Sequence, residues 1–131
     1  MSEKSERYDQ GMATRRSVLG ASYVDAATAK ASTYDEPFQT LITEAAWGHV
    51  WSRNTITKRE RSMMTLALLA GLGNFEELAL HTRATANTGA SRDDIMEAML
   101  HVAIYAGVPR ANHAIKVVKQ VLDEMDGGQK P

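Results

Sequence analysis

The segment SMMTLALLAGL at residues 62–72 consists almost entirely of apolar side chains and strong helix formers. It follows Thr57 and Glu60, whose spacing is typical of a helix-capping box. A helix that is apolar on all of its faces has to be covered on all of them. The segment therefore predicts a helix over residues 58–71 that lies within a helical core.

The same helical pattern continues in both directions from this segment. Helix formers fill long stretches, the chain has only three prolines, and strand-like alternation of polar and apolar residues is missing. Asn74 and Ser91 each precede a carboxylate by three residues, as N-capping residues do, and Gly89 suits a left-handed helix end. We expect an all-α fold of about six or seven helices, at residues 5–19, 25–32, 36–52, 58–71, 75–88, 92–106 and 110–125. We expect a single domain over residues 1–131, with frayed tails at about 1–5 and 126–131.

A second segment, from Ile95 to Ala106, is also apolar over most of its surface. A domain of 131 residues can bury few such helices by itself, so we expect copies of the chain to cover them in a homo-oligomer. His101 and Tyr105 lie one helical turn apart in this segment. We expect them to be buried, with their polar atoms satisfied by each other or by backbone carbonyls.

Composition and charge exclude several classes of function. The chain has no cysteine, which excludes disulfides, thiolate metal sites and thiol-based catalysis. A net charge of -1 gives no electrostatic reason to expect binding to nucleic acid or to an anionic membrane. The polar start MSEKSERYDQ lacks the apolar segment of a signal peptide. We expect a soluble, cytoplasmic protein whose partner is a small molecule.

His81 is the first candidate for proton chemistry. Asn74, Glu77 and His81 fall on one stripe of a helix, and Glu77 and His81 are one turn apart. A carboxylate beside an imidazole fixes its tautomer and supports its charged form. The alternative is a solvated surface pair in which Glu77 serves only a capping box. The spacing alone favours this alternative.

Three arginines stand next to apolar or aromatic segments, namely Arg53, Arg61 and Arg83. A guanidinium in such surroundings suits bidentate recognition of a carboxylate. We expect the other arginines considered to be ordinary surface residues; they are Arg15, Arg16, Arg59 and Arg92. Trp47 and Trp51, four residues apart, more often form a core stripe than a ligand platform. No HExxH or comparable ligand spacing occurs, so we expect no metal site.

Six stretches of the chain carry a more specific pattern. They are Arg7-Tyr-Asp-Gln-Gly-Met12, Arg15-Arg-Ser-Val-Leu-Gly20, Ala46-Trp-Gly-His-Val-Trp51 with Arg53, Arg59-Glu-Arg-Ser62, Glu77-Leu-Ala-Leu-His81 with Arg83-Ala84 and Asn87-Thr-Gly89, and Ile104-Tyr-Ala-Gly-Val-Pro-Arg-Ala-Asn112. In this order, from about Arg7 to Leu122, they resemble the carboxymuconolactone decarboxylase family. The resemblance implies the alkylhydroperoxidase D-like fold, which typically assembles into trimers or hexamers.

The resemblance also implies an activity. It is the cofactor-free decarboxylation of 4-carboxymuconolactone to 3-oxoadipate enol-lactone, in protocatechuate degradation through the 3-oxoadipate pathway. On this basis we assign His81 as proton donor or oxyanion partner and Glu77 as its orienting base or proton relay. The expected substrate-binding residues are Arg53, Arg61 and Arg83 for carboxylates, with Trp47 and Trp51 as apolar wall. Two alternatives stay open: a related enzyme acting on another lactone or carboxylate, and a non-catalytic helical oligomer that binds small acids.

Overall fold

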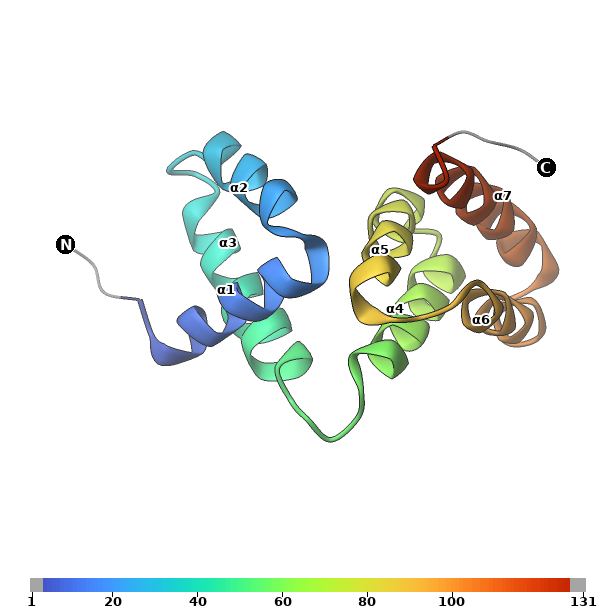
Figure 1. The fold of residues 1–131 in the computed structure, drawn as a ribbon, viewed down its shortest axis with the longest axis horizontal. Helices are drawn as coiled ribbons and strands as arrows, with labels where there is room; N and C mark the ends of the chain where they lie inside the picture. The colour runs from blue at the N-terminus through green and yellow to red at the C-terminus, as the bar shows by residue number, and fades with distance from the viewer. Residues whose placement is uncertain (1–3, 128–131) are drawn as a thin grey trace. The chain divides into compact units, whose positions relative to one another are not determined.

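The structure is a computed structural model that describes residues 4–127. All its regular elements are helices (Figure 1), and the described range contains no strand. The elements are α1 (Glu6–Leu19), α2 (Ala21–Lys30), α3 (Glu36–Ile42), the π-helix η1 (Thr43–Trp51), α4 (Lys58–Leu72), α5 (Phe75–Thr88), α6 (Arg92–Tyr105) and α7 (Val108–Met125). The prediction of an all-α protein is confirmed.

Most helix bounds agree with those expected from the sequence, and the main difference concerns residues 36–52. This stretch is helical, but α3 gives way to the wider π-helix η1 at Thr43. The helix expected at 25–32 begins earlier, at Ala21. The expected frayed tails fall largely outside the described residues, although α7 ends at Met125, where the helical pattern of the sequence stops.

Contacts divide the chain into two compact units, with the boundary between Thr57 and Lys58. In the N-terminal unit, α1 packs along η1. Their backbones meet at two glycines: a Cβ atom on Gly48 would lie 2.6 Å from the carbonyl oxygen of Arg7, and one on Gly11 would lie 2.8 Å from the Gly48 nitrogen. Only residues without a side chain permit this close approach.

The C-terminal unit consists of α4 to α7 around an apolar core (Figure 1). Its fully buried side chains come from all four helices and include Leu66, Leu78, Met99 and Val118. The capping box at the start of α6 is confirmed: the Ser91 hydroxyl accepts from the Asp94 amide at 3.0 Å, and the Asp94 carboxylate accepts from the Ser91 amide at 2.9 Å.

A bidentate ion pair ties the start of α4 to the start of α6. Arg59 donates to both carboxylate oxygens of Asp94, at 2.7 and 2.6 Å. The hydrogen bonds from Arg59, followed by that from the Ser91 backbone, hold the pKa of Asp94 well below its usual range. This carboxylate therefore stays ionised and keeps both helix starts in place.

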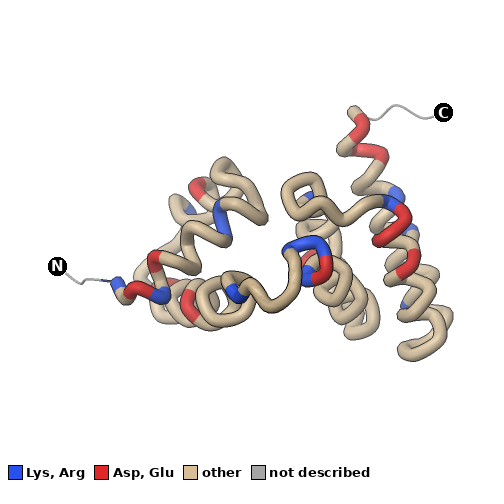
Figure 2. Tube along the Cα trace, turned by 60° about the horizontal axis from the view of Figure 1, so that its bottom comes forward, with Lys and Arg blue, Asp and Glu red and all other residues tan. Residues whose placement is uncertain are grey.

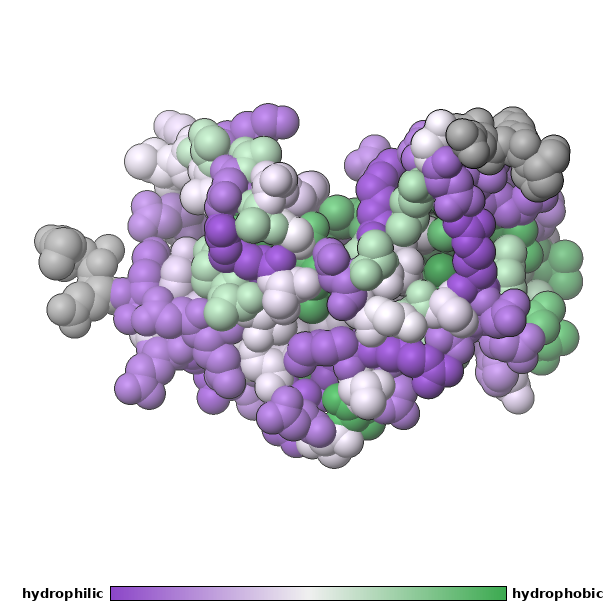
Figure 3. Space-filling view, in the orientation of Figure 1, coloured by the Kyte–Doolittle hydropathy of each residue, from purple (hydrophilic) through white to green (hydrophobic). Residues whose placement is uncertain are grey.

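The two segments predicted to be apolar on all faces form α4 and α6, and part of their surface is uncovered. Figure 2 shows that charged residues on both helices are confined to the N-terminal part, and Figure 3 shows apolar side chains gathered at the outer edge of the C-terminal unit. The exposed apolar side chains are Met64, Leu68 and Leu72 on α4 and Leu100, Ile104 and Tyr105 on α6. Within residues 4–127, no helix has the length and apolar character needed to cross a membrane.

The expectation of a buried His101–Tyr105 pair is wrong. Tyr105 is 85% exposed and His101 is exposed as well. Their rings stack with centroids 6.2 Å apart, and a ring nitrogen of His101 lies 3.4 Å from the Glu97 carbonyl oxygen. The two side chains lie on the face of α6 that no other element of the C-terminal unit covers, so an apolar helix did not imply a buried pair.

Candidate active site

His81 lies on the buried face of α5. This helix starts after Asn74 and ends at Gly89, whose φ of 86° is left-handed as expected. Its buried side chains recur at helical spacing and are Leu78, His81, Thr82, Ala84, Thr85 and Thr88. His81 is only 8% exposed. The alternative of a solvated surface histidine is therefore excluded for His81.

Burial determines the protonation state of His81. Loss of solvation lowers its pKa from 6.5 to about 4, because the charged imidazolium is disfavoured away from water. His81 is therefore neutral at physiological pH. A neutral imidazole offers one N–H donor and one ring nitrogen as acceptor. Such a group can donate a hydrogen bond to an oxygen on which negative charge develops.

Glu77, one turn before His81, is exposed. In the described part of the chain its carboxylate has no hydrogen bond or ion pair. The Asn74 side chain makes no capping hydrogen bond either, so the capping box expected here is not formed. The structure thus has a buried imidazole and a solvent-facing carboxylate on the same helix.

Arg61 lies on α4, which packs against α5. It is 8% exposed, and the adjacent Ser62 is 1% exposed. The Ser62 hydroxyl donates to the Thr88 hydroxyl at 2.6 Å and links the two helices. In the C-terminal unit, every buried polar or charged side chain of the described residues belongs to α4 or α5. Polar groups are thus concentrated in one helix pair of an otherwise apolar core.

The start of α4 has a positive character. The pKa of Lys58 is lowered by burial and, to a smaller extent, by the positive charge of Arg61. The first turn of α4 holds Lys58, Arg59 and Arg61 with one acidic residue, Glu60. The charge of Arg59 is balanced by Asp94. A buried guanidinium next to other cations suits an anionic ligand.

The structure places the other two candidate arginines on the surface. Arg83 is exposed on α5 and forms an ion pair with Glu124 at 3.1 Å. Arg53 is exposed in the segment that follows η1, in the N-terminal unit. Of the three arginines singled out, only Arg61 is buried on a helix that packs against the helix of His81.

Trp47 and Trp51 form a buried aromatic pair in η1. Each is 6% exposed, and their ring centroids lie 5.2 Å apart with the planes tilted by 31°. They contribute to the core of the N-terminal unit. Their burial is that expected of a core stripe, and their role as the apolar wall of a substrate site stays a prediction.

One arginine was missed at the sequence level. Arg15 was expected at the surface, which is wrong, because it is 7% exposed and lines a cavity in the N-terminal unit. The signal was present in the spacing: Gly11, Arg15 and Val18 lie on one face of α1, the face on which Gly11 meets η1.

In residues 4–127, no three metal-ligating side chains converge.

The sequence of the chain is similar to a known family and to known decarboxylases. The model of the carboxymuconolactone decarboxylase family matches residues 36–120. A nitrosuccinic acid decarboxylase of Metarhizium robertsii is 41% identical over 118 residues, covering 90% of this chain and 82% of that protein. A 4-carboxymuconolactone decarboxylase of Acinetobacter baylyi is 37% identical over 120 residues, covering 92% of this chain and 90% of that protein. The chain therefore belongs to the carboxymuconolactone decarboxylase family.

Proposed function

We propose that this carboxy-lyase converts 4-carboxymuconolactone to 3-oxoadipate enol-lactone and carbon dioxide, as a step of protocatechuate degradation through the 3-oxoadipate pathway. Two relatives that match about nine-tenths of the chain are decarboxylases, which supports the reaction class. The observation that carries the proposal is the buried, neutral His81 on α5, against which α4 packs with its buried Arg61.

The substrate supplies its own electron sink. When the bond between the ring and the carboxylate breaks, the electron pair passes through the carbon–carbon double bond to the lactone carbonyl oxygen. Carbon dioxide leaves, and the resulting dienolate takes up one proton at carbon to give the product. The protein has to bind the substrate carboxylates, stabilise the carbonyl oxygen and deliver the proton. No electron-accepting cofactor is needed for this sequence of steps.

We assign the charge stabilisation to His81. As a neutral imidazole, it donates its N–H to the carbonyl oxygen as negative charge develops there. This negative charge raises the pKa of the imidazole, so the same residue can take up a proton and transfer it to the ring carbon. A site from which water is excluded strengthens both interactions.

Glu77 acts in this proposal as the proton relay. It is exposed to solvent, whereas His81, one helical turn later, is buried. A carboxylate in this position can pick up a proton from water and hand it to the imidazole after a change of side-chain rotamer. Glu77→Gln should therefore slow reprotonation and leave substrate binding intact.

Arg61 is the first choice for holding a substrate carboxylate. It is buried and shares the start of α4 with Lys58 and Arg59. Arg53 and Arg83 remain candidates, although Arg83 is engaged by Glu124. A planar guanidinium binds a carboxylate through two parallel hydrogen bonds, which lysine cannot reproduce. Arg61→Lys should mainly raise KM.

Steady-state kinetics with the authentic lactone test the assignment of His81. His81→Gln removes the titratable donor with a side chain of similar polarity, and turnover should fall by about a hundredfold or more. The matched control is His113→Gln, which changes an exposed histidine on α7. Wild-type turnover in the His81 variant would remove His81 from the mechanism.

A second candidate substrate is nitrosuccinic acid, the substrate named for the Metarhizium robertsii relative. Its nitro group, like the unsaturated lactone, can accept the electron pair that a departing carboxylate leaves behind. Both molecules also carry more than one carboxylate. Parallel measurements of kcat/KM with the two substrates distinguish them. A protein that binds both acids and releases carbon dioxide from neither would instead be a non-catalytic acid-binding oligomer.

We also infer a homo-oligomer, a trimer or hexamer as the family resemblance implies. The support is the row of exposed apolar side chains on α4 and α6, among them Leu68 and Ile104. Light scattering should give a multiple of the 14.4 kDa chain mass. Leu68→Glu combined with Ile104→Glu should lower that mass, whereas Lys119→Glu on the exposed face of α7 should not. A monomeric wild-type protein would contradict the inference.

A further inference from the structure

We propose that the N-terminal unit contains a second ligand site, which binds a small carboxylic acid through Arg15. The site goes beyond the proposed decarboxylation, because none of its residues is assigned to that chemistry. It lies entirely within residues 4–43, so its geometry belongs to one compact unit.

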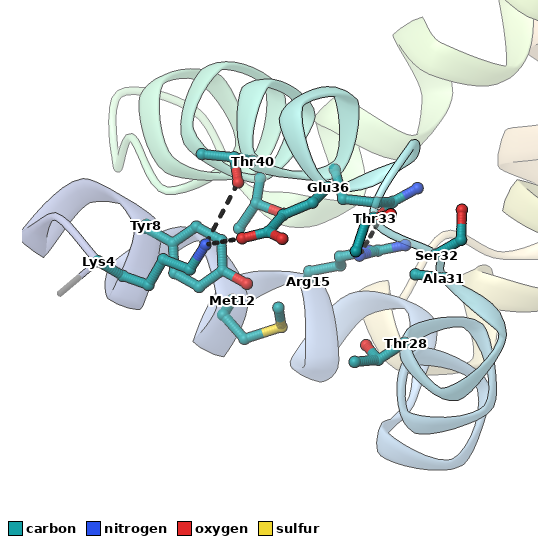
Figure 4. Close-up of a pocket in the computed structure, with 12 residues that line it drawn as sticks. Lys4, Tyr8, Met12, Arg15, Thr28, Ala31, Ser32, Thr33, Glu36 and Thr40 are labelled. Atoms are coloured by element: carbon teal, nitrogen blue, oxygen red, sulfur yellow. Dashed lines mark hydrogen bonds and ion pairs between the residues drawn. The ribbon is translucent and has the colours of Figure 1, made fainter. Parts of the chain in front are cut away.

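The site is a cavity of about 310 Å³. Figure 4 shows that its side chains come from α1, from the end of α2 and the connection after it, and from α3 with the start of η1. At about 30 Å³ for each water, the cavity has room for roughly ten water molecules. That volume accommodates a small organic acid.

Arg15 brings a positive charge into this cavity without a carboxylate to balance it. The residue is 7% exposed. Its Nη1 donates a hydrogen bond to a neutral acceptor, the Gln39 side-chain oxygen, at 3.4 Å. Its Nε is buried without a hydrogen-bond partner, and no acidic side chain in residues 4–127 pairs with it. A buried charge is costly unless an opposite charge accompanies it. An anion in the cavity would supply that charge.

Thr43 gives a second, independent indication of a ligand. It is 1% exposed, lines the same cavity and begins η1. Its hydroxyl is also buried without a hydrogen-bond partner. A hydroxyl donates readily to a carboxylate oxygen. A guanidinium at the cavity, with the Thr43 hydroxyl left without a hydrogen-bond partner in the cavity wall, suits a carboxylate.

The remaining charges of the cavity compensate each other. Lys4 Nζ lies 3.6 Å from a carboxylate oxygen of Glu36 and donates to the Thr40 hydroxyl at 3.5 Å (Figure 4). This pair is more exposed than Arg15, with side chains 33% and 61% exposed. The lining therefore carries one net positive charge, which matches a monocarboxylate.

The uncharged part of the lining indicates what the rest of the ligand is like. It combines hydroxyl groups from Tyr8, Thr28 and Thr33 with the apolar side chains of Met12 and Ala31. The hydroxyl groups can donate and accept hydrogen bonds, so they suit a ligand that carries hydroxyl or carbonyl groups beside its carboxylate. This mixed lining suits a small acid that has both an apolar part and a hydroxyl group.

Calorimetric titration of the full-length chain with sodium lactate, a small hydroxy acid, tests the site. Lactamide, which has the same shape without the charge, is the matched ligand control. Wild-type protein should bind lactate and bind lactamide at least about tenfold more weakly, because charge-assisted hydrogen bonds are lost. Equal binding of the two ligands, or no binding of lactate at millimolar concentrations, would overturn the proposal.

Variants locate the binding. Arg15→Met should weaken lactate binding at least about tenfold, and Thr43→Val should weaken it several-fold, since each removes a donor. The matched control is Arg16→Met. Arg16 follows Arg15 on α1, but its guanidinium forms an ion pair with Asp25. Circular dichroism identifies any variant that fails to fold, and Thr43→Val, which keeps the side-chain shape, then carries the test. Unchanged binding in folded Arg15 and Thr43 variants would refute the site.

The same titration separates this site from the proposed active site. His81→Gln should bind lactate as the wild type does, whatever its effect on turnover. Loss of lactate binding in that variant would place the acid at the His81 site and overturn the inference. Because binding is measured without turnover, failure of the decarboxylase proposal leaves this test unaffected.

Discussion

Acidification should destabilise this protein through His81, and the substitution His81→Gln should remove that part of the effect. The folded chain holds the His81 pKa at about 4 by burial, against an ordinary value of 6.5. Between these two pH values the unfolded chain binds a proton at this residue and the folded chain does not. The free energy of unfolding therefore rises with pH across this window.

The magnitude follows from the size of the shift. A difference of about 2.5 pKa units corresponds to roughly 3 kcal/mol at about 1.4 kcal/mol per unit. The stability contribution is fully present above pH 6.5 and is lost progressively as the pH falls towards 4. An average domain has only about 5–15 kcal/mol of stability in total, so this loss is large.

Urea unfolding followed by circular dichroism measures this contribution at a series of pH values. Carboxylates titrate in the same range, but their contribution is common to the wild type and to His81→Gln. The difference between the two proteins therefore isolates His81, and it should change by about 3 kcal/mol between neutral pH and pH 4. His113→Gln serves as the exposed-histidine control. A difference that does not vary with pH would refute the burial argument.

One further prediction concerns the activity, and two concern helix packing and helix capping. In a pH–rate profile, protonation of His81 should lower kcat/KM only when the pH falls to near 4, and not already near pH 6.5. Gly48→Ala should cost about 1–3 kcal/mol in thermal unfolding, because its Cβ would lie 2.6 Å from the Arg7 carbonyl oxygen; an unchanged Tm would contradict the close approach. Ser91→Ala should cost about 1 kcal/mol, since it removes a formed capping box, whereas Asn74→Ala should cost less because no cap is made there.

The helices of the C-terminal unit could be predicted from sequence because their signals are local. The capping box at Ser91 and the left-handed Gly89 determine helix ends through neighbouring residues. The π-helix η1 could not be predicted in the same way. Gly48 lies within η1 and meets Gly11 of α1, so the shape of this segment is tied to packing between parts of the chain far apart in sequence.

The site was only partly predictable for a similar reason. Spacing showed that Glu77 and His81 share a helix stripe, but burial depends on how α5 packs against other elements such as α4 and α7. His81 is buried, whereas Glu77 is exposed. The burial of Arg15 was missed because two adjacent arginines are typical of the solvent-exposed face of a helix. His101 and Tyr105 were expected to be buried because α6 is apolar. Part of the apolar surface of α6 is exposed to solvent, and these two side chains lie on it.

We propose that the chain releases carbon dioxide from a carboxylated lactone through its own side chains. Wild-type protein, exhaustively treated with a chelator, can be mixed with 4-carboxymuconolactone that is ¹³C-labelled at the ring carboxylate and followed by NMR. We predict that labelled carbon dioxide and bicarbonate appear at the rate of the untreated enzyme. Substrate that stays intact during a long incubation with the enzyme would contradict this proposal. Activity that returns only when metal is added back would contradict it as well.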